Sequence, residues 1–166
     1  MIRIKIITLG KLKEKYLREA EAEYLKRLSS YTKCELIELE PVRLSENPSS
    51  AEIGKALLSE AELIKKKITE NSFVVSLCIE GKQYSSEEMS SLIFKETTLG
   101  NSSLVFIIGS SFGLDDSIKN MANVKLSFSK MTFPHQLFRN MAEHESFPVN
   151  FGNTELDVTE HSFLNF

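Results

Sequence analysis

The chain has 166 residues, 42% of them hydrophobic, and a formal net charge of -3 at pH 7. This length is enough to bury one core without disulfides or metal ions, so we expect a single domain over residues 1–166. The slightly negative charge excludes binding to nucleic acid through the field of the whole molecule. Any surface that binds nucleic acid must therefore be a local patch.

The two cysteines indicate a reducing environment. Cys34 and Cys78 lie in apolar, strand-like runs without C-x-x-C spacing, which is typical of small buried hydrophobic residues rather than of zinc or redox sites. No apolar run approaches the roughly 20 residues needed to cross a bilayer, and the N-terminus lacks a signal-peptide core. We therefore expect a cytoplasmic protein with no metal and no membrane partner.

Strands and helices alternate along the first half of the chain. In chain order, the patterns predict a strand over Ile2–Thr8, a helix over Leu12–Leu28, a strand over Cys34–Leu39, a loop over Pro41–Ser50 and a helix that ends near Ile68. Lysine and arginine cover the outer faces of the first helix. This is typical of a solvated face, although its first turn, just past a strand end, could instead contact phosphates.

The second half continues the alternation. The patterns predict a strand over Phe73–Ile79, a turn at Glu80–Lys82, a helix capped by Ser85–Glu88 and closed by Gly100–Asn101, a strand over Leu104–Ile108, a short helix over Leu114–Met121 and a strand over Val124–Phe128. The nearly continuous apolar strands are typical of a sheet covered on both faces. The fold class is therefore α/β, with a mostly parallel sheet flanked by helices.

Two strand ends run directly into small or hydroxyl-bearing residues, and ligands bind at the carboxyl ends of parallel strands. After the first, Gly109 permits close approach of a ligand, and Ser110, Ser111 and Gly113 keep the turn small and polar. The spacing departs from the dinucleotide motif G-x-G-x-x-G, and no G-K-[ST] occurs. The sequence therefore favours a binding edge without the motif of a dinucleotide site or a P-loop.

After the second strand end, Ser127–Thr132 combines hydroxyl groups with a lysine, and Pro134 can start a new helix. The backbone of such a loop can hydrogen-bond an adenine edge while Phe128, Met131 and Phe133 pack against the ring. The alternative is a simple strand-to-helix turn with core aromatic residues. Composition alone leaves both interpretations open.

His135 is the candidate for proton transfer, because a histidine titrates near neutral pH. A lone histidine at a helix start can equally be a hydrogen-bonded structural residue. No Cys-His or Ser-His-Asp arrangement has a known family spacing, so the sequence gives hydrolase chemistry no specific support.

The motifs in combination closely resemble the RlmH family, methyltransferases of the SPOUT class that methylate N3 of a pseudouridine in 23S ribosomal RNA. The resemblance covers roughly residues 1–139. The matching segments are Gly10–Tyr16, Glu23–Leu28, Gly81–Lys82, Ser85–Glu87, Phe106–Gly109 and Leu126–Gln136.

The resemblance implies a C-terminal trefoil knot, a rare exception to unknotted chain topology. It also implies a homodimer that binds S-adenosylmethionine, needs no metal and acts on 23S RNA within the large subunit or the assembled ribosome. The family's cofactor positions carry over to Leu77, Gly109, Phe128, Ser129, Lys130, Met131, Thr132 and Phe133.

Residues 140–166 depart from the family pattern. The family continues through E-Q-x-Y-R-A and ends in a basic tail with Y-H-K, whereas this tail is acidic, and Pro148 and Gly152 would interrupt a helix. Ser110 also stands where the family commonly has glycine. Either a frameshift after Arg139 or true divergence would explain the tail. The alternative function is accordingly a knotted cofactor-binding domain that has lost catalytic activity.

Overall fold

The computed structural model describes residues 3–101, 103–131, 136 and 139. In chain order its elements are β1 (Arg3–Leu9), α1 (Lys15–Ser29), β2 (Lys33–Leu39), α2 (Ser50–Lys65), β3 (Phe73–Lys82), α3 (Ser86–Thr98), β4 (Ser103–Ile108), α4 (Asp116–Met121) and β5 (Val124–Leu126). The expected knot, the helix expected from Pro134 and the tail 140–166 lie outside the described residues.

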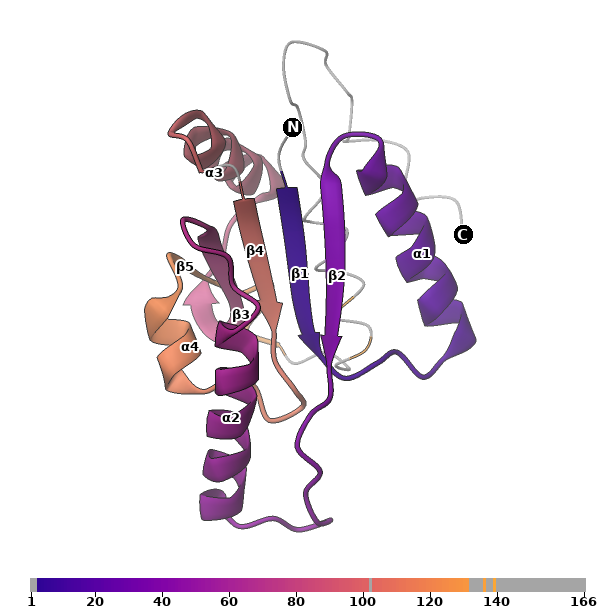
Figure 1. Cartoon of the computed structure of the whole chain (residues 1–166), viewed down its shortest axis with the longest axis vertical. Helices are drawn as coiled ribbons and strands as arrows, with labels where there is room; N and C mark the ends of the chain where they lie inside the picture. Colours follow the sequence, from indigo (N-terminus) through magenta and orange to yellow (C-terminus); the bar gives the residue numbers. More distant parts are fainter. Residues whose placement is uncertain (1–2, 102, 132–135, 137–138, 140–166) are drawn as a thin grey trace.

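The five strands form one parallel sheet in the order β2-β1-β4-β3-β5 (Figure 1). The register aligns the strand ends, because Ile108 pairs with Thr8 on one side and with Leu77 on the other. Leu77 in turn pairs with Leu126 of β5. The predicted α/β class is confirmed, and the polar segments that follow the strands meet at one edge of the sheet.

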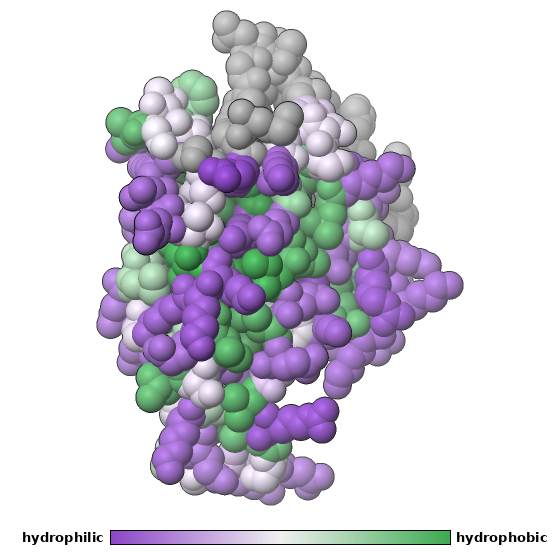
Figure 2. All heavy atoms as spheres, in the orientation of Figure 1, coloured by the Kyte–Doolittle hydropathy of each residue, from purple (hydrophilic) through white to green (hydrophobic). Residues whose placement is uncertain are grey.

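Alternate residues of each strand face opposite layers of helices, which explains the apolar runs. On one face, Leu28 of α1 and Met89 and Ile93 of α3 pack against the sheet. On the other face, Ala61 of α2 and Ile118 of α4 do so. Figure 2 shows apolar side chains gathered over the middle of this second face, with hydrophilic side chains around them. The sheet thus forms the middle of three layers.

Side-chain caps fix where two of these helices begin. Ser49 and Ser85 each accept a hydrogen bond from the backbone N–H three residues later, while Glu52 and Glu88 accept from the cap residue in return. Such capping boxes satisfy backbone donors that a helix leaves unpaired, and a cap typically contributes about 1 kcal/mol. The cap expected from Ser85 and Glu88 is confirmed.

The turn predicted at Glu80–Lys82 is wrong, because β3 continues to Lys82. Its pairing with β5 is interrupted by a bulge after Leu77 and resumes where Lys82 pairs with Leu126. A Cβ atom on Gly81 would lie 2.7 Å from backbone atoms of Lys125 and Leu126. Glycine therefore allows the two strands to approach here, a role that a sequence pattern cannot distinguish from a turn.

Other boundaries also differ from the expectations. The first helix begins at Lys15 rather than Leu12. The preceding Lys13 N–H donates to Oε1 of Gln136, and no side chain caps the start of the helix. The fifth strand ends at Leu126 rather than Phe128, and the next N–H, that of Ser127, donates a hydrogen bond to the carbonyl of Lys82. Within the described residues, no helix is long and apolar enough to span a bilayer.

Candidate functional site

A cavity of about 400 Å³ opens at the bulge of β3 and the carboxyl end of β4, and we call it the β3–β4 cavity. The loop after β5 forms its third side. Its lining consists of Leu77, Cys78, Ile79, Glu80, Ile108, Gly109, Ser110, Ser111, Phe112, Gly113, Leu114, Lys119, Ser127, Phe128, Ser129 and Met131. Most of these side chains are apolar or carry a hydroxyl group, which suits a ligand with flat apolar faces and a polar edge.

Gly109 makes the turn after β4 possible. A Cβ atom at this position would lie 2.4 Å from the carbonyl oxygen of Gly113, closer than real atoms approach. The turn is closed by the Gly113 N–H, which donates to the carbonyl of Ser110 at 2.8 Å, and Gly113 itself has a φ of +89°. The close contact at Gly109 is thus with Gly113 of its own chain rather than with a ligand. Both glycines line the cavity together with Leu77.

The loop after β5 is held by its own hydroxyl groups. Ser127 Oγ donates to the carbonyl of Ser129 at 3.0 Å, and Ser129 Oγ accepts from the Met131 N–H at 2.9 Å. Ser127 is buried and Phe128 is half-buried against the core, whereas Met131 is 73% exposed. The loop therefore combines a fixed backbone with an apolar side chain that is left uncovered at the mouth of the cavity.

The β3 bulge forms the fourth side of the cavity. Glu80 lies on it and forms an ion pair with Lys119 of α4 at 2.5 Å, and the hydrogen bond from Lys119 lowers the pKa of Glu80. Burial raises the pKa of the neighbouring Cys78 thiol. A thiol with a raised pKa stays protonated and is a poor nucleophile. Cys78 therefore lines the wall without offering covalent chemistry.

Five residues expected at the cofactor site line this one cavity: Leu77, Gly109, Phe128, Ser129 and Met131. The structure thus brings together segments that are up to 54 positions apart in the sequence, from Leu77 to Met131. That they hold a cofactor stays a prediction.

Lys130 belongs to the same loop and is exposed, but it does not line the cavity. Thr132 and Phe133, as well as the proton-transfer candidate His135, lie outside the described residues.

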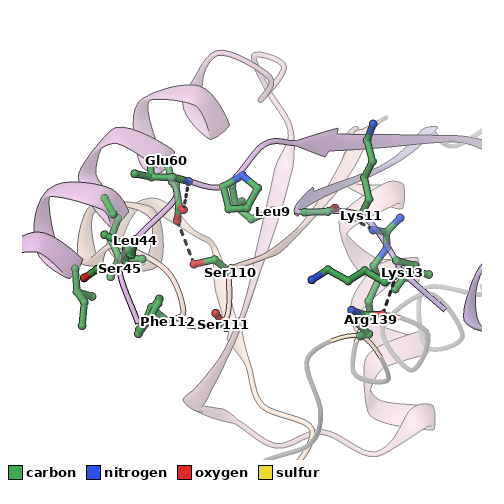
Figure 3. A pocket seen from close by; sticks show the side chains of 18 residues that line it. Leu9, Lys11, Lys13, Leu44, Ser45, Glu60, Ser110, Ser111, Phe112 and Arg139 are labelled. Atoms are coloured by element: carbon green, nitrogen blue, oxygen red, sulfur yellow. Dashed lines mark hydrogen bonds between the residues drawn. The ribbon is translucent and has the colours of Figure 1, made fainter. Parts of the chain in front are cut away.

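A second cavity, also of about 400 Å³, lies at the ends of β1 and β4, and we call it the β1–β4 cavity (Figure 3). Sequence reasoning missed it. Its most unusual residue is Glu60, which is only 4% exposed and accepts hydrogen bonds from the Val42 N–H at 2.9 Å and from Ser110 Oγ at 3.2 Å. Burial raises the pKa of Glu60.

One available signal was the position of Glu60 within α2. It shares the buried stripe of that helix with Ala56, Ala61 and Ile64. A carboxylate in an otherwise apolar stripe needs hydrogen-bond partners, and these come from elements that only the fold brings near.

Arg139 closes the far side of the β1–β4 cavity. Its guanidinium group is buried, lies 2.8 Å from Oε1 of Glu38, contacts the carboxylate of Glu21 and donates to the carbonyl of Gly10 at 3.2 Å. These partners are more than 100 positions away in the sequence, so no local pattern could reveal them. The arginine fixes the chain end of the described region against β1 and β2.

No group of three or more His, Cys, Asp or Glu side chains is arranged to hold a metal ion among residues 3–101, 103–131, 136 and 139. Several polar side chains at the two cavities form hydrogen bonds or ion pairs with one another, as Ser110 does with Glu60 and Lys119 does with Glu80.

Comparisons with known proteins agree with this architecture. Residues 2–144 match the family model described as "Predicted SPOUT methyltransferase". The Ribosomal RNA large subunit methyltransferase H of Streptococcus equi subsp. zooepidemicus is 49% identical over 138 residues, which are 83% of this chain and 87% of that protein. The protein of the same name from Clostridium acetobutylicum is 50% identical over 140 residues, 84% of this chain and 88% of that one.

Among solved structures, a probable methylase family protein from Haemophilus influenzae Rd KW20 aligns with a TM-score of 0.45 and 12% identity, over 89% of this chain and 66% of that chain. The family is shown by the family match and by the two relatives rather than by this structural alignment. The resemblance to the RlmH methyltransferases is thereby confirmed, and with it the use of a methyl donor. This chain belongs to the SPOUT methyltransferase family.

Proposed function

We propose that this protein transfers a methyl group from S-adenosylmethionine to N3 of a pseudouridine in 23S ribosomal RNA, acting as a cytoplasmic homodimer on the large subunit or the assembled ribosome. The observation that carries the proposal is the convergence of Leu77, Gly109 and the loop Phe128–Met131 on the β3–β4 cavity. The substrate follows the relatives, which are named large-subunit ribosomal RNA methyltransferases.

The residues of the β3–β4 cavity suit this donor. The side chains of Leu77, Phe128 and Met131 offer apolar surface for an adenine ring, and Ser127 and Ser129 bring backbone and hydroxyl groups that can hydrogen-bond its polar edge to the same cavity. Glu80 and Lys119 add an ion pair to the wall, so this side of the cavity presents both an acceptor and a donor to a ligand. S-adenosylmethionine supplies an already activated methyl group.

The chain therefore has to contribute position rather than bond activation. The fixed loop 127–131 and the tight turn at Gly109 give a rigid cradle, because their hydrogen bonds and close contacts leave few alternative conformations. With S-adenosylmethionine bound, these residues would hold the donor in one position relative to the acceptor, and positioning of this kind can account for a large part of a rate enhancement. The acceptor N3 must lose its proton in the reaction.

A calorimetric titration with S-adenosylmethionine, combined with a methyl-transfer assay on ribosomes that lack this methylation, tests the proposal. We expect binding and transfer. Binding without transfer would favour the alternative, a cofactor-binding domain without catalytic activity, although the names of the relatives favour the enzyme. Failure to bind S-adenosylmethionine would contradict the proposed donor site.

A further inference from the structure

The two cavities adjoin one another at the turn after β4. Ser110, Ser111 and Phe112 line both of them. A ligand in the β1–β4 cavity would therefore lie next to a ligand in the β3–β4 cavity, with these three residues at the junction of the two. This placement suits a second reactant better than an unrelated ligand, because methyl transfer requires donor and acceptor to meet.

The β1–β4 cavity has two chemically different walls, which face each other in Figure 3. One wall carries apolar side chains together with Glu60 and Ser110, and its apolar members include Leu44 and Phe112. The opposite wall carries Lys11, Lys13 and Arg139. A ligand that matches both walls has a flat apolar body with a hydrogen-bonding edge at one end and a negative charge at the other.

The cations of the second wall differ in availability. The Arg139 guanidinium group is already engaged by Glu38, Glu21 and the carbonyl of Gly10. In the part of the chain that the structure describes, Lys11 and Lys13 form no ion pair with an acidic side chain. Lysine is a common phosphate ligand, and these two exposed lysines line the cavity.

We propose that the β1–β4 cavity holds the acceptor nucleotide, with its phosphate near Lys11 and Lys13 and the edge of its base near Ser110 and Glu60. This inference rests on the proposed function and adds to it the place where the RNA enters. It also meets the requirement that a chain of net negative charge bind RNA through a local basic patch.

The chemistry of the base edge favours a pseudouridine. Its ring is joined to the ribose through carbon, so both ring nitrogens carry a hydrogen and can donate, whereas the uridine ring has one such donor. The Glu60 carboxylate is an acceptor and retains lone pairs beyond those used by Val42 and Ser110. Pseudouridine can give this acceptor one hydrogen bond that uridine cannot, so the site would discriminate by the extra N–H.

The first test is an NMR titration of the full chain with pseudouridine 5′-monophosphate as the probe. We expect amide shifts at Lys11, Lys13 and Ser110. The double variant Lys11→Gln/Lys13→Gln should lower the affinity for this nucleotide by about fivefold, a typical effect of removing two exposed ionic contacts. The affinity for the uncharged nucleoside should stay unchanged.

The matched control is Lys33→Gln/Lys95→Gln, which removes the same charge at exposed positions away from the cavity. An equal loss of nucleotide affinity in both double variants would overturn the inference. It would also be overturned if the nucleotide shifted the amide signals of neither Lys11 nor Ser110 in the natural protein.

Glu60→Gln tests the base edge. The Gln amide oxygen can still accept from the Val42 N–H, so the fold keeps this contact, but the amide replaces one carboxylate oxygen by a donor. We expect the preference for pseudouridine 5′-monophosphate over uridine 5′-monophosphate to fall by about tenfold or to vanish. An unchanged preference would contradict the assigned role of Glu60.

Titration of the same samples with S-adenosylmethionine separates this inference from the proposed function. Nucleotide binding without donor binding in the natural protein would leave the β1–β4 cavity assigned but contradict the donor site. Donor binding without nucleotide shifts would leave the proposed function standing and overturn the inference alone.

Discussion

The two cavities lie side by side at one edge of the sheet, yet they are built in different ways. The β3–β4 cavity is formed by the bulged part of β3 and by the short segments that follow β4 and β5, and backbone contacts at Gly109 and at the neighbouring Gly81 shape this region. The β1–β4 cavity is held by side-chain contacts between distant residues, above all those of Arg139 and Glu60.

This difference has physical consequences. A cavity shaped by backbone geometry tolerates changes in side-chain charge but not an added atom at its glycines. A cavity held by buried charges tolerates changes in volume better than the loss of one partner, which leaves the other charge uncompensated. Substitutions of the two kinds should therefore damage the two cavities selectively.

Arg139→Met should have the largest effect. It removes a buried guanidinium group and leaves Glu21 and Glu38 facing each other without a counterion. We expect the free energy of unfolding to fall by about 3 kcal/mol in a urea titration. Arg27→Met, at an exposed i,i+4 pair with Glu23, is the matched control and should cost less than about 0.5 kcal/mol. Equal losses in the two variants would show that Arg139 does not anchor the β1–β4 cavity.

Gly109→Ala should act on the other cavity. The new Cβ atom would meet the Gly113 carbonyl oxygen, so the turn must shift, and we expect a loss of about 2 kcal/mol and at least tenfold weaker S-adenosylmethionine binding by calorimetry. In contrast, Gly54→Ala adds a Cβ atom inside α2 where nothing lies within 4 Å, and should stabilise the protein by about 0.5–1 kcal/mol. Normal donor affinity in Gly109→Ala would contradict the backbone-shaped cradle.

Glu60→Gln should change how stability depends on pH. The pKa of Glu60 is raised above 4.5 in the folded protein because burial disfavours the ionised form. The favourable contribution of the protonated group is therefore present below pH 4.5 and is lost as the pH rises through the folded-state pKa. Across this window the natural protein should lose stability relative to the variant in thermal unfolding.

The control for this pH dependence is Glu62→Gln, which changes an exposed carboxylate on the same helix. If it gave the same profile as Glu60→Gln, the effect would not arise from the buried position.

Lys119→Met should have the smallest effect. It removes the ion pair with Glu80, whose side chain is 56% exposed, so the loss in stability should be below about 1 kcal/mol at neutral pH. The pKa of Glu80 is lowered by this hydrogen bond, hence the contribution is present above pH 4.5 and disappears as the pH falls through the folded-state value. A double-mutant cycle with Glu80→Gln measures it. A coupling energy as large as the Arg139 effect would erase the contrast between the two cavities.

The contrast also explains what the sequence could predict. The parallel sheet and the β3–β4 cavity were accessible because hydrophobic periodicity marks strands, and the residues that follow parallel strands must meet at one edge. The family resemblance then selected Leu77, Gly109 and Met131 among those residues. All three line one cavity in the structure.

The β1–β4 cavity was not accessible in this way. The contacts of Arg139 with Glu38 and Gly10 join residues more than 100 positions apart, and Glu60 was indistinguishable from the other acidic residues on helix surfaces until its neighbours were known. The bulge in β3 was missed for a related reason, since Gly81 serves the approach of Lys125 and Leu126 rather than a turn.

The most direct test of the central claim is a crystal structure of the full chain with S-adenosylmethionine. We predict the adenosyl group in the β3–β4 cavity, between Leu77, Gly109 and the loop Phe128–Met131, with its methyl group directed toward Ser110–Phe112, where the two cavities adjoin. A donor molecule bound elsewhere, with the β3–β4 cavity closed by protein side chains, would contradict the account.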